Sequence, residues 1–393
     1  MAVTELREVV EPTWGERMGS SFKGIVIGLA LFVGGFPLLF WNEGRAVATA
    51  KSLEEGRGCV VELSDPMVDP DNEGKLVYVS GKAVTGDVLS DPVFGISFNG
   101  IRLQRRTEIY QWVEHSKTRR IERNGKKYDE TTYTYSKKWS SEPVDSSEFK
   151  ESGHDNPPVH WQGDETFQAE DVMIGDFRLP PASISRIGGA QKMRLGPDFK
   201  VPESLPGAQV AGDVIYLPVQ NQYAPAARQV AAMPELGDQR VTFRQVPQHG
   251  VSIVARQMGD SFADWISSNK RAVNLQSDGI VSVDELFADA ESSNALKTWL
   301  FRLLGFVVMF IGIKMILGPL TTLVDKIPGI NWLVGSLASL TAFVIAAVSA
   351  LVTIAVAWIF YRPIVAGILL GAAALLVACF VSRRKAAKAK AKE

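Results

Sequence analysis

The residues with the clearest potential for chemistry lie in one loop. His154, Asp155 and His160 carry imidazole and carboxylate groups, which are common protein ligands of zinc. Their spacing matches no established zinc pattern, and the motifs HExxH, GxGxxG, GxSxG, paired CxxC and the phosphate-binding loop are absent from the sequence. With Cys59 and Cys379 as the only cysteines, no disulfide framework is available. We therefore expect no catalytic residue, metal site or cofactor, and keep a membrane enzyme acting through this loop as an alternative.

A second polar group ends the first long apolar segment. Residues 24–41 contain no charge, yet an amide, a carboxylate and a guanidinium follow at once. An aromatic ring before such a change is typical of the headgroup layer of a membrane. A cleavable signal peptide is the alternative, since residues 46–48 resemble a cleavage site. We interpret the group as a membrane-exit motif; it consists of Trp41, Asn42, Glu43, Gly44 and Arg45.

Two cations lie inside a later apolar segment, residues 299–317. Arg302 is near one end of the segment and Lys314 is near the other. An unpaired charge in lipid is costly, so such residues indicate either function or a side chain that reaches the interface. We interpret both as snorkelling side chains. Lys314 also motivates an alternative function, a channel or transporter subunit.

The apolar residues concentrate in four segments, each close to the length of about 20 residues that a helix needs to cross a bilayer. The average composition of the 393 residues conceals this, with 22% charged and 46% hydrophobic. The net charge of −1 gives no global field for nucleic acid. We predict an α+β membrane protein in which a large β-rich extracytosolic domain is inserted between the first and second of four transmembrane helices. The helices are predicted at residues 24–41, 299–317, 337–358 and 363–381.

The basic tail sets the predicted orientation. Residues 382–393 carry six lysines and arginines, which places both termini in the cytosol and the domain, residues 58–298, outside it. Residues 1–23 are then a cytosolic segment. We expect residues 42–57 to continue the first helix as a stalk and residues 318–336 to form a cytosolic or interfacial loop.

The longest feature of the domain is a predicted β-hairpin. Asn124-Gly125 favours a two-residue type I′ turn. If these residues form the loop, Arg119 opposes Glu130 and Tyr110 opposes Trp139, which are favourable cross-strand pairs. One face then carries aromatic residues that either pack in the sheet or bind a partner: Tyr110, Trp112, Tyr133, Tyr135 and Trp139.

Shorter patterns predict the remaining elements. Residues 76–84 alternate as a strand, and residues 240–246 and 250–257 form a second hairpin candidate, joined through residues 247–250. Ser282 and Glu285 have the spacing of a helix capping box, which leads into the second membrane helix.

Small residues spaced four apart predict close helix packing, either within one chain or between chains. They are Gly24 with Gly28, the ladder of Ala338, Ala342, Ala346 and Ala350, and Gly367 with Gly371.

Eight separated stretches, in order, resemble the LUMA (transmembrane protein 43) family. They include IYQWVE at 109–114, ETTYTYSKKWSSE at 130–142, GHDNP at 153–157 and WIFYRP at 358–363. The resemblance implies four membrane helices, a large domain after the first and both ends in the cytosol. For animal relatives it implies the endoplasmic reticulum and inner nuclear membrane, self-association, and links to lamin and emerin. It implies no catalytic residues. The short N-terminal segment and the Lys/Ala tail suggest a bacterial homologue, where there is no lamina.

These observations lead to one expected function. We expect a non-enzymatic, self-associating multi-pass scaffold that organises membrane or envelope partners through its extracytosolic domain. Its expected partners are the lipid bilayer, further copies of the chain and an unidentified membrane or envelope protein, without nucleic acid. The expected location is the cytoplasmic (inner) membrane in a bacterium, or the endoplasmic reticulum and inner nuclear membrane in a eukaryote.

Overall fold

The chain has an α+β fold made of two compact units. The computed structural model describes residues 4–10, 14–123, 126–219, 229–323, 331–368 and 371. The β-rich unit comprises residues 1–11, 56–266 and 272–287. The helical unit comprises residues 12–55, 267–271 and 288–393.

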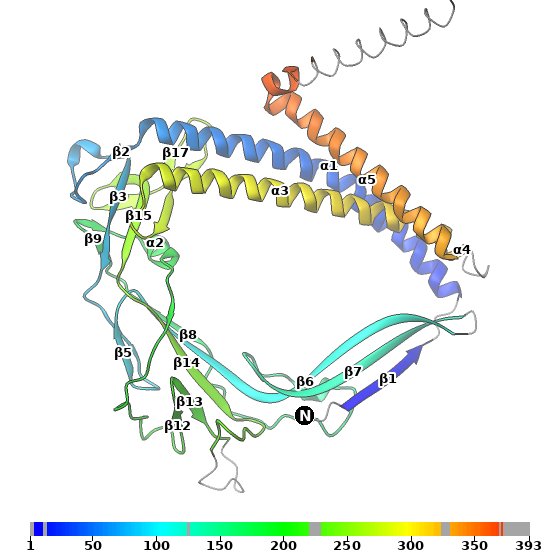
Figure 1. The fold of residues 1–393 in the computed structure, drawn as a ribbon, viewed down its shortest axis with the longest axis horizontal. Coiled ribbons are helices and arrows are strands. Elements are labelled where there is room, and N and C mark those ends of the chain that lie inside the picture. The colour runs from blue at the N-terminus through cyan, green and yellow to red at the C-terminus, as the bar shows by residue number, and fades with distance from the viewer. Residues whose placement is uncertain are drawn as a thin grey trace, which may run out of the picture. The chain divides into compact units, whose positions relative to one another are not determined.

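Two large sheets form most of the β-rich unit (Figure 1). The first has the strand order β1-β7-β6-β14-β13-β12, with β8 on β6 and β11 on β14. Its strands are β1 (Thr4–Val10), β6 (Arg102–Arg123), β7 (Lys126–Ser140), β8 (Glu165–Gln168), β11 (Gln191–Lys192), β12 (Gln209–Ala211), β13 (Val214–Leu217) and β14 (Gln239–Val246). The second has the order β19-β15-β16-β10-β9-β3-β2, with β15 also on β3. Its strands are β2 (Val61–Glu62), β3 (Leu76–Val84), β9 (Met173–Ile174), β10 (Phe177–Arg178), β15 (Gly250–Met258), β16 (Ser261–Ala263) and β19 (Leu275–Asp278).

Smaller elements complete this unit. Two short antiparallel pairs join β4 (Val88–Asp91) to β5 (Ile96–Asn99) and β17 (Trp265–Ile266) to β18 (Ala272–Val273). The helical turns are α2 (Pro181–Arg186), η1 (Pro70–Asn72) and η2 (Ser146–Glu148).

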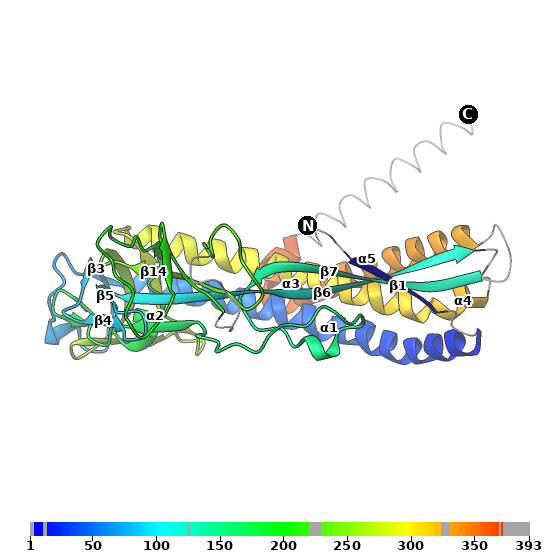
Figure 2. The same cartoon turned by 90° about the horizontal axis from the view of Figure 1, so that it is seen from below.

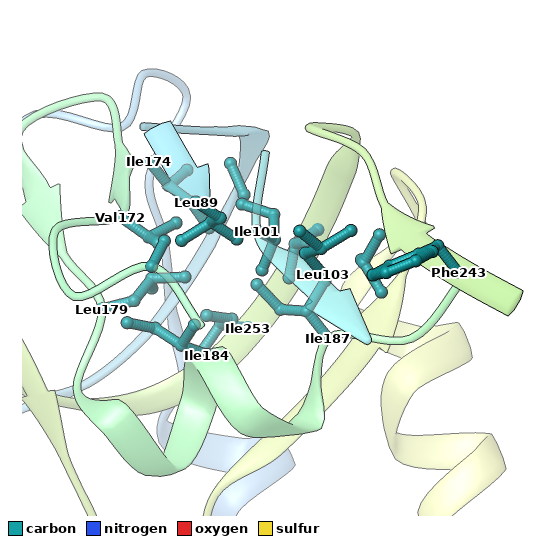
Figure 3. Packing of buried hydrophobic residues seen from close by; sticks show 14 of the residues in the cluster. Leu89, Ile101, Leu103, Val172, Ile174, Leu179, Ile184, Ile187, Phe243 and Ile253 are labelled. Carbon is teal, nitrogen blue, oxygen red and sulfur yellow. The ribbon is translucent and has the colours of Figure 1, made fainter. Parts of the chain in front are cut away.

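The two sheets share one hydrophobic core, part of which Figure 3 shows. Leu103 and Phe243 come from the first sheet, and Val79 and Ile253 come from the second. Each of the four side chains is at most 1% exposed. Burying such a side chain contributes about 1.5–3 kcal/mol, so this shared core is the main force that holds the two sheets together.

The predicted register of the long hairpin is confirmed. Arg119 opposes Glu130 and Tyr110 opposes Trp139 in the pairing of β6 with β7. The Arg119 Nε atom donates a hydrogen bond to Glu130 Oε2 over 2.6 Å, although the arginine side chain is largely exposed. The turn residues Asn124-Gly125 lie outside the described residues. The predicted strand at 76–84 is confirmed as β3.

The second predicted hairpin is wrong, because β14 and β15 do not pair. β14 pairs with β6, β11 and β13, whereas β15 pairs with β3, β16 and β19. The connection at residues 247–249 therefore carries the chain from one sheet to the other. Val246 closes the first ladder by accepting a hydrogen bond from Ile101 N, and His249 O accepts one from Ala83 N in the second. Both strands were correctly located in the sequence, but the alternation of apolar residues does not report which strand is the neighbour.

The N-terminal residues also differ from expectation. β1 pairs antiparallel with β7, so that Glu8 opposes Thr131 (Figures 1 and 2). The physical reason is that β7 would otherwise present an open edge of unpaired backbone groups. A single membrane crossing by the following helix would separate residues 4–10 from the β-rich unit. This pairing and the predicted cytosolic position of residues 1–23 therefore exclude each other.

Three long helices dominate the helical unit. They are α1 (Trp14–Cys59), α3 (Val283–Ile316) and α5 (Asn331–Tyr361), and a short α4 (Gly318–Leu323) follows α3. α1 continues through residues 42–57 without interruption. At the start of α3, Glu285 N donates a hydrogen bond to Ser282 Oγ over 3.2 Å, which confirms the cap.

Each long helix contains a stretch that is long and apolar enough to cross a membrane. These candidate spans are Lys23–Cys59, Val283–Ile316 and Leu333–Tyr361. Of the predicted fourth helix at 363–381, residues 363–368 are helical. Most of the rest of that segment, and the tail 382–393, lie outside the described residues. Part of the predicted loop 318–336 is helical instead, since α4 and the first turns of α5 occupy it.

Small residues bring the helices into close contact within one chain. A Cβ atom added to Gly28 would lie 2.5 Å from the Gly312 carbonyl oxygen, so α1 and α3 can approach this closely only at glycine. Gly24 lies in the same contact, and its added Cβ would be 3.8 Å from Met315 O. The alanine ladder of α5 joins the buried cluster, with Ala338 half-buried at one end; the buried members are Leu39, Met309, Ile313, Ala342, Ala346 and Ala350.

The pairing of β1 with β7 predicts a specific cross-link. In a background carrying Cys59→Ser and Cys379→Ser, the pair Glu8→Cys and Thr131→Cys should form an intramolecular disulfide under mild oxidation. Directly opposed residues of antiparallel strands have Cα atoms about 4.5–5.5 Å apart, which suits a disulfide. Mobility on non-reducing gels measures it. The out-of-register pair Glu8→Cys and Thr134→Cys is the control and should stay reduced. No disulfide in the first pair would support a cytosolic N-terminal segment.

Candidate functional site

Three helices bring a set of polar side chains together at one end of the apolar bundle. α1 supplies Asn42, Glu43 and Arg45, which belong to the membrane-exit motif. α3 supplies Asn294, Thr298 and Arg302. These three lie four residues apart, so they share one face of the helix. Of these three residues, only Arg302 stands out in the sequence as an intramembrane charge; the four-residue spacing is the signal that identifies the other two. We call these six residues and Trp358 of α5 the exit cluster.

Glu43 is the centre of the exit cluster. Its side chain is fully buried, and Arg302, whose side chain is 15% exposed, binds it with two hydrogen bonds. Arg302 Nε donates to Oε1 over 2.6 Å and Nη2 donates to Oε2 over 2.9 Å. Trp358 Nε1 donates to Oε2 over 2.9 Å. The carboxylate therefore ties α1 to both α3 and α5.

The Arg302 guanidinium is also packed between aromatic rings. Its Cζ atom lies 4.8 Å from the Trp299 ring centroid and 5.8 Å from that of Trp358. A cation over an aromatic face gains up to about 2 kcal/mol when it is desolvated. Arg302 is thus held by an ion pair and by two indole rings. The snorkelling expected from the sequence does not describe this residue.

Arg45 extends the exit cluster by one turn. Its Nη1 atom donates to Asn294 Oδ1 over 3.0 Å, and Nη2 donates to Thr298 Oγ1 over 3.1 Å and Asn42 Oδ1 over 3.2 Å. The two asparagines then reach backbone carbonyls, with Asn42 Nδ2 bonded to Thr298 O and Asn294 Nδ2 bonded to Ala46 O. Side-chain amides that cap carbonyls across two helices fix their rotation and their axial register.

A second set of contacts fixes the stalk part of α1. The segment Ser267–Arg271 belongs to the helical unit and lies against it. Ser52 Oγ donates to Asn269 Oδ1 over 2.7 Å, and Asn269 Nδ2 donates to Ala48 O over 2.8 Å. The Glu55 carboxylate accepts bonds from the Ser268 backbone N and from Ser268 Oγ. α1 is therefore held by hydrogen bonds over about four turns, from Asn42 to Glu55.

The exit cluster is built for positioning. Both Glu43 oxygens accept hydrogen bonds from Arg302 and Trp358, so the carboxylate is held as an acceptor. Separating the two charges of a buried ion pair costs much free energy, because each charge would then lie unpaired in apolar surroundings. The exit cluster therefore holds the three helices in one arrangement.

Other predicted residues of the bundle lie elsewhere. Lys314 is exposed, and its Nζ atom lies 5.9 Å from the Phe310 ring centroid. It is therefore on the outer surface of the described helices, where the snorkelling interpretation fits. Trp41 is 52% exposed and packs edge-on against Phe301. Gly44 faces Tyr361, whose ring would lie 2.6 Å from an added Cβ.

The loop residues proposed as alternative metal ligands lie among other contacts in the described part of the chain. No group of three histidine, cysteine, aspartate or glutamate residues there could hold a metal ion. His154 is buried and lies between Tyr135, stacked at 4.1 Å, and Trp112, edge-on at 4.6 Å. His160 contributes its carbonyl oxygen to a hydrogen bond from Gln239 Nε2.

The hairpin aromatics pack against neighbours. Tyr135 is fully buried, and Tyr110 and Trp139 are half-buried with ring centroids 5.3 Å apart. Lys137 covers Trp112 at 4.8 Å. Tyr133 is half-buried as well. The packing alternative therefore fits these five residues better than an open binding platform.

Tyr135 has the most perturbed surroundings of this group. Its hydroxyl donates a hydrogen bond to Glu114 Oε2 over 2.6 Å and accepts one from Glu151 N over 3.0 Å. Burial, aided by the bond to Glu114, raises the pKa of Tyr135 to about 12. An ionised phenolate here would be desolvated and would face a carboxylate, so the neutral form is favoured.

Comparisons with known proteins identify relatives along almost the whole chain. The family model described as Transmembrane protein 43 matches residues 109–363. The mouse protein named Transmembrane protein 43 is 34% identical over 390 residues, which is 96% of this chain and 94% of the relative. The human protein of that name is 34% identical, covering 95% and 93%, and a Drosophila melanogaster homologue is 30% identical, covering 91% and 94%. No solved structure matches the chain.

Stability should depend on Tyr135 at high pH. Because the folded-state pKa is raised above the unfolded value near 10, the contribution is complete below pH 10. This contribution to the free energy of unfolding is about 2–3 kcal/mol, since one pKa unit corresponds to about 1.4 kcal/mol. It is lost as the pH rises through 12. Ultraviolet titration of the folded protein should show a late-ionising tyrosine that Tyr135→Phe removes. Tyr133→Phe is the control and should leave it. Complete ionisation near pH 10 would contradict this environment.

Breaking the ion pair of the exit cluster should destabilise the protein strongly. Glu43→Gln leaves Arg302 buried without a counter-charge, which typically costs about 3–5 kcal/mol. We expect a clear drop in the midpoint of thermal unfolding in mild detergent for Glu43→Gln. The drop should be smaller when Glu43→Gln is combined with Arg302→Gln, because that variant leaves no unpaired charge. Lys314→Gln, which removes an exposed cation from the same bundle, should change the midpoint little. Equal effects of Glu43→Gln and Lys314→Gln would refute the role of the pair.

Proposed function

Because the chain belongs to the transmembrane protein 43 family of membrane proteins, we propose that it is a non-enzymatic membrane scaffold. In this proposal it self-associates in the bilayer and organises membrane or envelope partners through an extracytosolic β-rich domain. The proposed location is the cytoplasmic membrane in a bacterium or the endoplasmic reticulum and inner nuclear membrane in a eukaryote. The chain acts by holding components in place and does not turn over a substrate.

The observation that carries the proposal is the self-contained exit cluster. Its most buried charge, Glu43, is matched by Arg302, and its buried amides reach backbone carbonyls. A site for turnover usually leaves a nucleophile, an acid or a base directed into an open pocket. Here the charged groups fix the helices from which the stalk extends. A rigid base of this kind suits a protein that keeps its membrane helices in one arrangement.

Self-association is supported by the one small-residue pair that the described contacts leave free. The glycines at Gly28 and Gly312 and the alanine ladder are used inside the chain. At Gly367 and Gly371, by contrast, no described atom lies within 4 Å of an added Cβ. Such a face lets two helices from different chains approach closely in lipid.

Partner binding by the domain is supported by the outer part of the β6–β7 hairpin. Side chains at residues 115–119 of β6 are exposed, whereas residues 102–114 are buried or half-buried apart from Arg106. Backbone pairing with β7 continues to the end of β6. Backbone pairing therefore orders residues 115–119, and exposed side chains there, such as Lys117, are available to another molecule.

The test is the mass of the particle in mild detergent. Light scattering during size-exclusion chromatography should give an oligomer for the natural chain. Gly367→Leu combined with Gly371→Leu should shift it towards the monomer, because the added side chains keep the helices apart. Ala355→Leu is the control: Ala355 is exposed on α5 and has no small residue four positions away. A monomeric natural chain would count against the proposal. An unchanged oligomer in the glycine variant would also count against it, provided that the natural chain and the variant show the same normal hydrogen-exchange pattern.

A further inference from the structure

A cavity of about 400 Å³ adjoins the exit cluster. Its apolar and aromatic lining residues are Ala46, Ala50, Ala295, Trp299 and Trp358. Its polar lining residues are Glu291, Asn294, Thr298, Arg302 and Arg362. All of these residues belong to the helical unit.

The cations of this cavity are not equivalent. Arg302 is already neutralised by Glu43 through two hydrogen bonds. Arg362 is half-buried, and in the described part of the structure its guanidinium has neither an ion pair nor a hydrogen bond. A guanidinium carries five donors in a planar fork that matches phosphate geometry. Arg362 therefore leaves the cavity with an unsatisfied anion-binding group.

The position of the cavity along the helices suggests where the anion comes from. Arg362 directly follows the candidate span Leu333–Tyr361. Trp299 is 66% exposed, and exposed apolar side chains continue along α3 with Leu300 at 56% and Leu303 at 58%. Tryptophan and arginine at the end of an apolar stretch mark the headgroup layer of a bilayer. Below that layer, the leucines offer a surface for acyl chains.

We propose that this cavity binds the phosphate group of an anionic phospholipid. Arg362 is the main cation that contacts the phosphate, and Trp299 shields the headgroup at the interface. The acyl chains lie along the exposed leucines of α3. Glu43 pairs with Arg302, so Arg362 is the cation that remains for the phosphate.

The test uses the full chain, delipidated in mild detergent and titrated with phosphatidylglycerol or phosphatidylcholine. Native mass spectrometry counts the retained lipid. The natural chain should retain phosphatidylglycerol preferentially, and Arg362→Gln should weaken this retention about tenfold, the factor that corresponds to about 1.4 kcal/mol. Arg362→Lys should restore part of it. Because no contact in the described structure depends on the Arg362 side chain, the variants should fold normally, and the thermal midpoint checks this.

The matched control is Lys297→Gln. Lys297 is exposed on α3 next to Thr298 but does not line the cavity. It should retain lipid as the natural chain does. Equal retention of the two lipids, no effect of Arg362→Gln, or an equal loss in Lys297→Gln would each overturn the proposal. Full displacement of the lipid by millimolar inorganic phosphate would overturn the lipid as the source of the anion.

Discussion

A buried carboxylate in a membrane helix needs a positive partner, and this constraint organises the helical unit. Glu43 lies between three helices with no exposed surface, and Arg302 is the group that makes this tolerable. The pair need not add stability compared with apolar residues of the same shape. It does specify one arrangement, because any shift of α1 along α3 would separate the two charges. The glycine contact between Gly28 and Gly312 then sets how closely the two helices approach.

In the β-rich unit, the main constraint is that the backbone N–H and C=O groups along its long strands need hydrogen-bond partners. β6 has 22 residues, many more than the hydrophobic core needs. Its inner part pairs with β14 and β8 and contributes Leu103 to the core, while the outer part pairs with β7 alone. β1 covers the free edge of β7 with seven paired residues. Packing therefore stabilises one end of this ribbon and hydrogen bonding the other.

Local features of the fold could be predicted from the sequence, and long-range pairings could not. The Asn124-Gly125 dipeptide in the sequence predicts one alignment of the two strands, and the pairing of β6 with β7 has that register. The sequence of residues 240–246 and 250–257 also fits a hairpin. The two strands belong to different sheets because of packing in the shared core, which the local sequence does not report. The membrane charges show the same limit. Glu43 and Arg302 are 259 positions apart, and each was interpreted alone. The polar row on α3 was visible in the sequence, but its meaning required the partner helix.

The unbroken α1 helix imposes a constraint on evolution and on engineering. Glu43 and Arg45 must face α3, whereas Ser52 and Glu55 must face the segment Ser267–Arg271. In an α-helix, each added residue turns everything beyond it by about 100° and advances it by about 1.5 Å. One insertion between Arg45 and Ser52 would therefore swing one group of side chains away from its partners. The number of residues between these positions sets the angle between the two groups of side chains. Substitutions there are therefore far easier to accommodate than insertions or deletions.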